Sequence, residues 1–260
     1  MFATLLNPRS FASSLDEQIH LVRQLGGPFL SASVVDLVAA RSAGLQTGLL
    51  LRDQSDASLA DQVARGVKES DAEIVAIHTR ALDTPMDERA SNVASLVRAL
   101  RAAEGRHRMI ITLGGSLAAQ GASAWRSLPM ESLLFDPIED PDGWRAAATL
   151  PGECGVVLAL IGGSGVAPVA REVLLWGLRY AASLGGRGGV RVGFTERPGR
   201  GWGDDEYASP AAGHAATYAA LRALLELTAA DRETLERELD PRSISPVARI
   251  ARRGDSRETP

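Results

Sequence analysis

The sequence contains a single cysteine, Cys154, and a single lysine, Lys68, among its 260 residues. One cysteine allows no internal disulfide and no metal site built from several thiolates. Lys68 lies in a pattern typical of an amphipathic helix, away from any predicted strand end, so we do not expect Schiff-base chemistry. Positive charge therefore comes almost wholly from arginine, which suits recognition of carboxylate or phosphate groups, although genomic base composition explains the same bias.

Long apolar runs and a strong excess of one charge are also absent. No run approaches the roughly 20 apolar residues of a membrane span, and the apolar start of the chain is too short for a signal peptide and lacks its basic flank. The formal net charge of -4 gives no electrostatic reason to expect binding to nucleic acid or to a membrane. We therefore expect a cytoplasmic protein.

Short β-branched or leucine-rich runs alternate with helical patterns along the chain. Runs that are apolar throughout are typical of strands buried on both faces of a parallel sheet. Eight such βα units in a chain of this length predict an α/β protein with a single (βα)8 TIM barrel. The predicted strands are Phe2–Leu6, Pro28–Val34, Leu45–Leu51, Glu73–Thr79, Arg108–Leu113, Glu131–Asp136, Gly155–Ile161 and Val190–Phe194.

Helical patterns fill the spaces between these strands, and glycines such as Gly44 and Gly105 end several of them just before the next strand. One more amphipathic helix is expected over Ala229–Leu239. We assign residues 1–240 to the barrel and residues 241–260 to an Arg-rich, flexible tail. The predicted helices between strands are Leu15–Leu25, Val35–Ala43, Ser58–Glu69, Asp87–Ala103, Ala122–Ser127, Asp142–Thr149, Ala167–Leu184 and Pro210–Leu227.

The carboxyl ends of barrel strands form the usual active-site face. Several arginines around one mouth would favour an anionic substrate. Ser164 lies in a glycine-rich turn, Gly162–Gly165, that could hold a phosphate on backbone amides or be a plain tight turn. The candidate substrate-binding residues at this face are Asn7, Arg9, Ser31, Ser33, Arg52, Arg80, Thr112, Asp136, Ser164 and Thr195, with Trp202 in the loop that follows the last strand.

Three residues are candidates for catalysis. Arg191 falls inside the eighth predicted strand, where a buried charge is costly unless it is paired or used, so we expect it to hold a substrate carboxylate or to form a structural ion pair. Glu196 is a candidate general base, with an ordinary salt bridge as the alternative. His78 ends the fourth strand and could act as a base or a hydrogen-bond donor. It has no histidine partner at metal-ligand spacing, so we expect no metal site.

The run LGGRGGVRVGFTER, residues 184–197, resembles the eighth-strand motif of the β-keto acid cleavage enzymes, in which a glycine pair leads into Val-Arg-Val-Gly-Leu-Glu-Asp. GGPFLSASVVD is similar to that family's second-strand pattern, which ends in His-X-His-Val-Arg-Asp. LLLRDQSDASLADQVARGVKESDAEIVAIH resembles its third strand, helix and fourth strand. LPGECGVVLALIGGSGVAP resembles its seventh strand.

This resemblance implies that Arg191 takes the place of the family's catalytic arginine and Glu196 that of its acidic residue. The two zinc-binding histidines fall on Ser31 and Ser33, and the metal-binding glutamate falls on Thr195. Hydroxyl groups are poor zinc ligands compared with imidazole, so we expect neither this metal nor another cofactor. Members of the family cleave or exchange a β-keto acid with acetyl-CoA by a retro-Claisen route, and the resemblance suggests a homo-oligomer.

A weaker likeness joins MIITLGGSL and LPMESLLFD to the cobalamin-independent methionine synthase barrel, whose zinc thiolates this chain cannot supply. The leading hypothesis is a metal-independent barrel enzyme acting by acid–base chemistry on a small or medium anionic substrate of keto-acid or polyketide type. The reaction would be an enolisation, a cleavage or rearrangement of a carbon–carbon bond, or a cyclisation. The alternatives are a zinc-dependent, acetyl-CoA-linked β-keto acid cleavage enzyme and a catalytically silent barrel that binds a ligand or a partner.

Overall fold

The computed structural model describes residues 2–6, 8–10, 12–53, 58–79, 86–113, 126–141, 143–161, 171–187 and 191–196. The strands are β1 (Phe2–Ala3), β2 (Phe29–Ser31), β3 (Thr47–Arg52), β4 (Ile74–His78), β5 (His107–Ile111), β6 (Ser132–Phe135), β7 (Gly155–Ile161) and β8 (Val192–Glu196). The helices are α1 (Leu15–Leu25), α2 (Val34–Ser42), α3 (Leu59–Ser70), α4 (Met86–Ala102), α6 (Gly143–Thr149) and α7 (Arg171–Ser183), with 3-10 helices η1 (Pro8–Ser10) and η3 (Leu184–Gly186).

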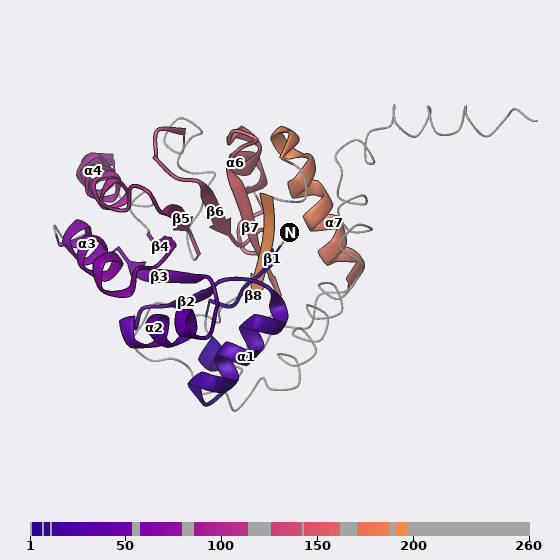
Figure 1. Ribbon diagram of the computed structural model, residues 1–260. Helices are drawn as coiled ribbons and strands as arrows, with labels where there is room; N and C mark the ends of the chain where they lie inside the picture. Colours follow the sequence, from indigo (N-terminus) through magenta and orange to yellow (C-terminus); the bar gives the residue numbers. More distant parts are fainter. Residues whose placement is uncertain are drawn as a thin grey trace, which may run out of the picture.

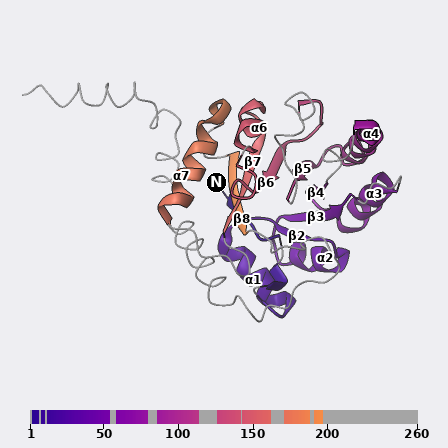
Figure 2. The same cartoon turned by 180° about the vertical axis from the view of Figure 1, so that it is seen from behind.

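These strands form one sheet in the order β1-β8-β7-β6-β5-β4-β3-β2, and every neighbouring pair is parallel. The sheet curls, and the labelled helices lie around its outside (Figure 1). The view from behind shows the same arrangement (Figure 2). Leu5, which follows β1, forms an isolated parallel bridge with Phe29 of β2, so the two edges of the sheet meet.

The α/β class and the parallel sheet are therefore confirmed. The complete (βα)8 barrel stays a prediction, because the helix expected over Pro210–Leu227 lies outside the described residues. The predicted helix Ala229–Leu239 and the tail, residues 241–260, also lie outside them.

Two apolar layers line the sheet because successive strand residues point to opposite faces. The outer layer, which includes Val75, Ile77 and Phe194, packs against helix residues such as Val22 and Leu96. The inner layer is a separate cluster that fills the inside of the curl. It contains Leu6, Leu30, Ile74, Ala76, Met109, Ile111, Leu113, Leu134, Val157 and Ala159, and the partly buried Leu50 packs against it.

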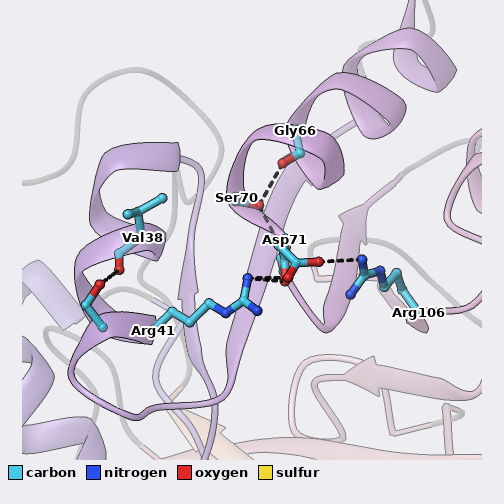
Figure 3. Close-up of polar contacts among 8 residues, drawn as sticks. Val38, Arg41, Gly66, Ser70, Asp71 and Arg106 are labelled. Atoms are coloured by element: carbon cyan, nitrogen blue, oxygen red, sulfur yellow. Dashed lines mark hydrogen bonds and ion pairs between the residues drawn. The ribbon is translucent and has the colours of Figure 1, made fainter.

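Ion pairs tie the elements together at the amino end of the sheet (Figure 3). Asp71 follows α3 in the left-handed conformation, with φ at 50°, and its carboxylate contacts Arg41 of α2 and Arg106, which precedes β5. The Arg106 Nη2 atom lies 2.6 Å from Asp71 Oδ1. Hydrogen bonds from Arg106 and then Arg41 hold the pKa of Asp71 below its ordinary value. Asp71 thus links α2, the end of α3 and the segment before β5 through partly exposed ion pairs.

A buried arginine joins the carboxyl ends of α6 and α7. The Arg187 side chain is only 1% exposed and donates to the backbone carbonyls of Ala147, Pro151, Cys154, Ala181 and Leu184. The last carbonyls of a helix have no intrahelical partner and carry partial negative charge, so a guanidinium with five N–H donors satisfies several of them at once. Of the two arginines in the glycine-rich stretch that leads into β8, Arg187 is therefore the buried one and Arg191 is exposed.

Candidate functional site

Two of the predicted site residues are neighbours at the carboxyl end of the sheet. Arg52, the last residue of β3, is paired in register with His78, the last residue of β4. Both continue the alternation of the inner layer, since Ala76 belongs to that cluster and Leu50 packs against it. Neighbouring strands lie about 4.8 Å apart, so the guanidinium and the imidazole start side by side from adjacent backbones.

The imidazole of His78 is oriented by a backbone group. Its Nε2 atom lies 3.0 Å from the carbonyl oxygen of Leu113, and the side chain is buried. A carbonyl can only accept a hydrogen bond, so Nε2 must carry the proton. In the neutral ring the basic lone pair is then at Nδ1. The site therefore presents an imidazole whose tautomer is fixed by its surroundings.

Hydrogen bonds of the next residues, Asp53 and Thr79, hold the Arg52–His78 pair in register. The backbone N–H of Asp53 donates to the carbonyl of His78 over 2.8 Å. The Thr79 hydroxyl donates to Asp53 Oδ2 over 2.7 Å, and the Thr79 N–H donates to the carbonyl of Ile111 over 3.0 Å. The residues that directly follow Arg52 and His78 are thus hydrogen-bonded to each other, which ties the two strand ends together.

A second polar pair ends β8. The Thr195 hydroxyl donates to Glu196 Oε2 over 2.7 Å, and both side chains are buried. The β7–β8 register shifts between Ala159 and Ile161, and Ile161 pairs with Glu196. The extra residue of this bulge is on β7, so the alternation of β8 is unbroken and Glu196 shares the face of Phe194 in the outer layer. Thr195 fixes one oxygen of this buried carboxylate at the same end of the sheet as His78.

Asp136 lies directly after β6 and is also buried. Its Oδ1 atom accepts hydrogen bonds from the N–H groups of Ile138 and Glu139 over 2.8 and 3.0 Å. One oxygen of this carboxylate therefore shapes the turn that leads toward α6. Four of the charged or titratable residues at this face have further partners beyond those described here, namely Arg52, His78, Asp136 and Glu196.

Ser31 and Ser33 serve the start of α2. The Ser33 hydroxyl accepts the N–H of Asp36 over 3.3 Å as the helix N-cap, and the Ser31 hydroxyl accepts the N–H of Ser33 over 3.0 Å. The Asp36 carboxylate accepts from Ser31 over 3.4 Å and forms an ion pair with Arg9 over 2.9 Å. Three of the predicted substrate-binding residues are thus engaged in one capping network.

The zinc that the family resemblance implies does not fit these residues. Its ligands would be Ser31, Ser33 and Thr195, whose hydroxyls are occupied by backbone N–H groups or by Glu196. A neutral hydroxyl engaged in this way is a poor zinc ligand. Among the residues that the structure describes, no group of three or more His, Cys, Asp or Glu side chains could hold a metal ion.

Arg191 does not lie where the sequence placed it. It is exposed, precedes β8, and donates to the carbonyl of Gly152 over 3.4 Å. Five strand residues at about 3.3 Å each separate it from Glu196 by roughly 16 Å. The expectation that Arg191 is a buried, catalytic charge inside the eighth strand is therefore wrong. The strand begins two residues later than predicted, so Arg191 lies before it, at its amino end.

Of the remaining predicted site residues, one has a structural partner and four lie outside the described part of the chain. The Thr112 hydroxyl donates to the carbonyl of Leu134 over 3.2 Å, which gives it a structural partner between β5 and β6. Thr79, which ties the ends of β3 and β4 together, was not predicted as a site residue. Its place at the end of a predicted strand could have indicated that it lies at the site. The predicted site residues that lie outside the described part of the chain are Asn7, Arg80, Ser164 and Trp202.

Comparison with known proteins defines the class of fold. No family model matches the chain, and no curated protein matches it. Solved TIM-barrel structures do match it. One is a B12-independent methionine synthase from Shewanella sp. W3-18-1, in complex with selenomethionine. It aligns with a TM-score of 0.55 and 14% identity over 78% of this chain and 67% of that one.

None of the described helices is long and apolar enough to cross a membrane.

A second solved structure is a xylose isomerase-like TIM barrel/4-hydroxyphenylpyruvate dioxygenase fusion protein. It aligns with a TM-score of 0.53 and 15% identity over 95% of this chain and 45% of that one, so this chain spans less than half of the fusion protein. At these identities the likeness concerns the fold alone. The predicted likeness to the methionine synthase barrel is confirmed at that level, whereas a likeness to β-keto acid cleavage enzymes is not shown.

Proposed function

We propose that this chain is a barrel enzyme that moves a proton on a small anionic, keto-acid-like substrate. The observation that carries the proposal is the Arg52–His78 pair, which lies in register on adjacent strands at the carboxyl end of the sheet and continues its inner face. Parallel barrels place their chemistry at that end. A cation beside a base of fixed tautomer suits a substrate that carries both a negative charge and an acidic proton.

Arg52 has the planar fork that binds a carboxylate through two charge-assisted hydrogen bonds. Once the substrate carboxylate is held there, Nδ1 of His78 can take a proton from the carbon next to the keto group. The electron pair of the broken C–H bond moves into the enolate, whose oxygen is stabilised by the same positive charge. Return of the proton to another atom completes an enolisation, and the same enolate is the starting point for carbon–carbon bond cleavage or cyclisation.

Glu196 is given no step in this scheme, because the alternation of β8 puts it on the same face as Val192 and Phe194, which belong to the outer layer. A zinc-dependent route is disfavoured by the capping roles of Ser31 and Ser33.

The test measures binding and proton exchange separately. Isothermal titration with acetoacetate and longer β-keto acids reports binding, and NMR reports deuterium incorporation at the α-carbon above the uncatalysed rate. Arg52→Met should weaken binding about 100-fold, because it removes a charge-assisted bidentate contact. His78→Gln should change binding little and slow exchange on the order of 100-fold or more.

Arg191→Met is the matched control, since it removes an exposed arginine at the opposite end of β8. We expect wild-type binding and exchange in this variant. Equal losses in Arg52→Met and Arg191→Met would contradict the proposed site. Binding without exchange in the wild-type protein would favour a silent ligand-binding barrel, and one equivalent of zinc in elemental analysis of the purified protein would contradict the metal-independent route.

A further inference from the structure

Leu50 lies inside the curl of the sheet, directly below the proposed site. It precedes Arg52 by two residues on β3, so both side chains point to the inner face. The register pairs Leu50 with Ala76, which lies two residues before His78 on β4. Leu50 and Ala76 are therefore the next pair of inner-face residues beneath Arg52 and His78.

Leu50 differs from its neighbours in the inner layer because part of its side chain is exposed. Ala76, Ile111 and Leu134 of that layer are fully buried, whereas Leu50 is partly buried and packs against the cluster. A side chain that points into the curl can contact solvent only where the curl is open. Solvent therefore reaches the inner face at Leu50.

The short length of β2 explains this exposure. β2 ends at Ser31, whose register partner is Leu49, so β3 continues past its neighbour from Leu50 to Arg52. Ala32, the next residue after β2, has a small side chain and is exposed. Arg52 is partly exposed, as Leu50 is. The inner face is thus open toward β2 at the level of these two side chains.

The inner face closes again just below Leu50. Gly48 lies two residues earlier on β3, and a Cβ atom there would collide with the side chain of Leu30. Leu30 is only 1% exposed, so it fills the space over Gly48. Two strand residues span about 7 Å. A ligand held at Arg52 therefore meets an apolar surface at Leu50 over a short distance and can extend no deeper.

We propose that Leu50 sets the substrate preference of the site by binding the alkyl chain of a β-keto acid whose carboxylate is held by Arg52. This inference rests on the proposed function and narrows its substrate class to keto acids with a short saturated chain beyond the keto carbon. The α-carbon then lies beside His78, and the chain covers the exposed part of Leu50. A polar tail would lose hydration against this apolar side chain without gaining a hydrogen bond there.

Isothermal titration of the full chain with acetoacetate and with 3-oxohexanoate measures the ratio of their dissociation constants. The second acid has two more methylene groups, and each buried methylene strengthens binding about fourfold. We expect 3-oxohexanoate to bind on the order of 10-fold more tightly, slightly less than two fully buried methylenes would give.

Two substitutions at Leu50 test the contact. Leu50→Asn keeps the size of the side chain but makes it polar, and it should lower the ratio to about 2 or less. Leu50→Phe fills the space that the alkyl chain would take and should lower the ratio as well. The matched control is Val38→Asn, at a 46% exposed valine on α2, which should keep the wild-type ratio. Circular dichroism at the assay temperature checks that every variant is folded.

Equal dissociation constants for the two acids in the wild-type protein would overturn the inference. A ratio that both Leu50→Asn and Leu50→Phe leave unchanged would also overturn it. In either case the proposed function still stands if Arg52→Met weakens the binding of both acids. If neither acid binds to the wild-type protein, the proposed function is wrong, and so is the assignment of Leu50.

Discussion

At the scale of single residues, Cys154 shows how burial sets reactivity. It lies just before β7, is 5% exposed, and its thiol donates weakly to the carbonyl of Gly155. Burial raises the pKa of this thiol to about 11, although the neighbouring charge of Arg187 opposes the shift. The thiolate is the reactive species, so the native thiol should be nearly inert at neutral pH.

We therefore predict that the folded protein reacts with Ellman's reagent at pH 7.5 at least about 100-fold more slowly than the same chain in denaturant. Because the chain has one cysteine, the absorbance change reports Cys154 alone. Fast, stoichiometric labelling of the native protein would show that this region opens readily.

Residue-scale errors in the sequence interpretation have a common physical cause. Arg187 and Arg191 are four residues apart in one glycine-rich stretch, and the apolar residues after Arg191 suggested a buried charge there. The carbonyls that surround Arg187 belong to residues between 147 and 184, which are distant from it along the chain or lie on neighbouring elements. No local pattern reveals such partners, so the sequence could not tell the structural arginine from the exposed one.

At the scale of secondary-structure elements, Arg187 holds α6 and α7 to the segment that enters β7. We predict that Arg187→Met lowers the free energy of unfolding by about 3 kcal/mol or more, because several buried carbonyls lose a charged donor. Arg187→Lys should lose less, since an ammonium group keeps the charge but cannot reach all the carbonyls at once. Urea denaturation with matched m-values measures both changes.

The exposed Arg191 provides the control for this experiment, because Arg191→Met removes only one long hydrogen bond, to Gly152. Its free energy of unfolding should stay within about 0.5 kcal/mol of wild type, as is usual for surface substitutions. A larger loss in Arg191→Met than in Arg187→Met would reverse the structural assignment.

Helix starts and ends follow local chemistry closely. Ser14 and Glu17 form a capping box at the start of α1, with hydrogen bonds of 3.3 and 3.1 Å, and Gly26 ends that helix with φ at 68°. Such short-range signals explain why the predicted bounds of α1 agree with the structure. The capping of α2 by Ser33 was also readable from the sequence, but the family resemblance suggested a ligand position instead.

At the scale of the whole molecule, acid should destabilise the fold in two stages. Hydrogen bonds from Arg106 lower the pKa of Asp71 from its ordinary value of 3.8. Burial raises the pKa of Glu131, but hydrogen bonds from Arg108 outweigh it and bring the net pKa below 4.5. Burial lowers the pKa of His107 from 6.5. In each case the unfolded chain binds the proton more readily, so stability falls as the pH falls.

The expected result is a Tm that is constant near pH 7–8, declines below about pH 6.5 as His107 begins to titrate in the unfolded chain, and falls more steeply below about pH 4.5. Asp71→Asn should lower the Tm at neutral pH and flatten the steep acid limb, while asparagine still tolerates the left-handed backbone there. Differential scanning calorimetry across pH 3–8 measures the Tm of the wild-type protein and of Asp71→Asn. A Tm that rises on acidification would contradict the assigned directions.

The sequence by itself determined the order of strands and helices and the parallel sheet, because the βα period, the apolar runs and the helix-ending glycines are all local signals. It also placed Arg52 and His78 at strand ends. Only the tertiary structure decided that these two are register neighbours, that Ser31 and Ser33 cap α2, and that Arg187 is the buried charge. Those outcomes depend on backbone carbonyls and strand registers contributed by distant segments, and the free energy of a buried polar group is set by the partners it meets there.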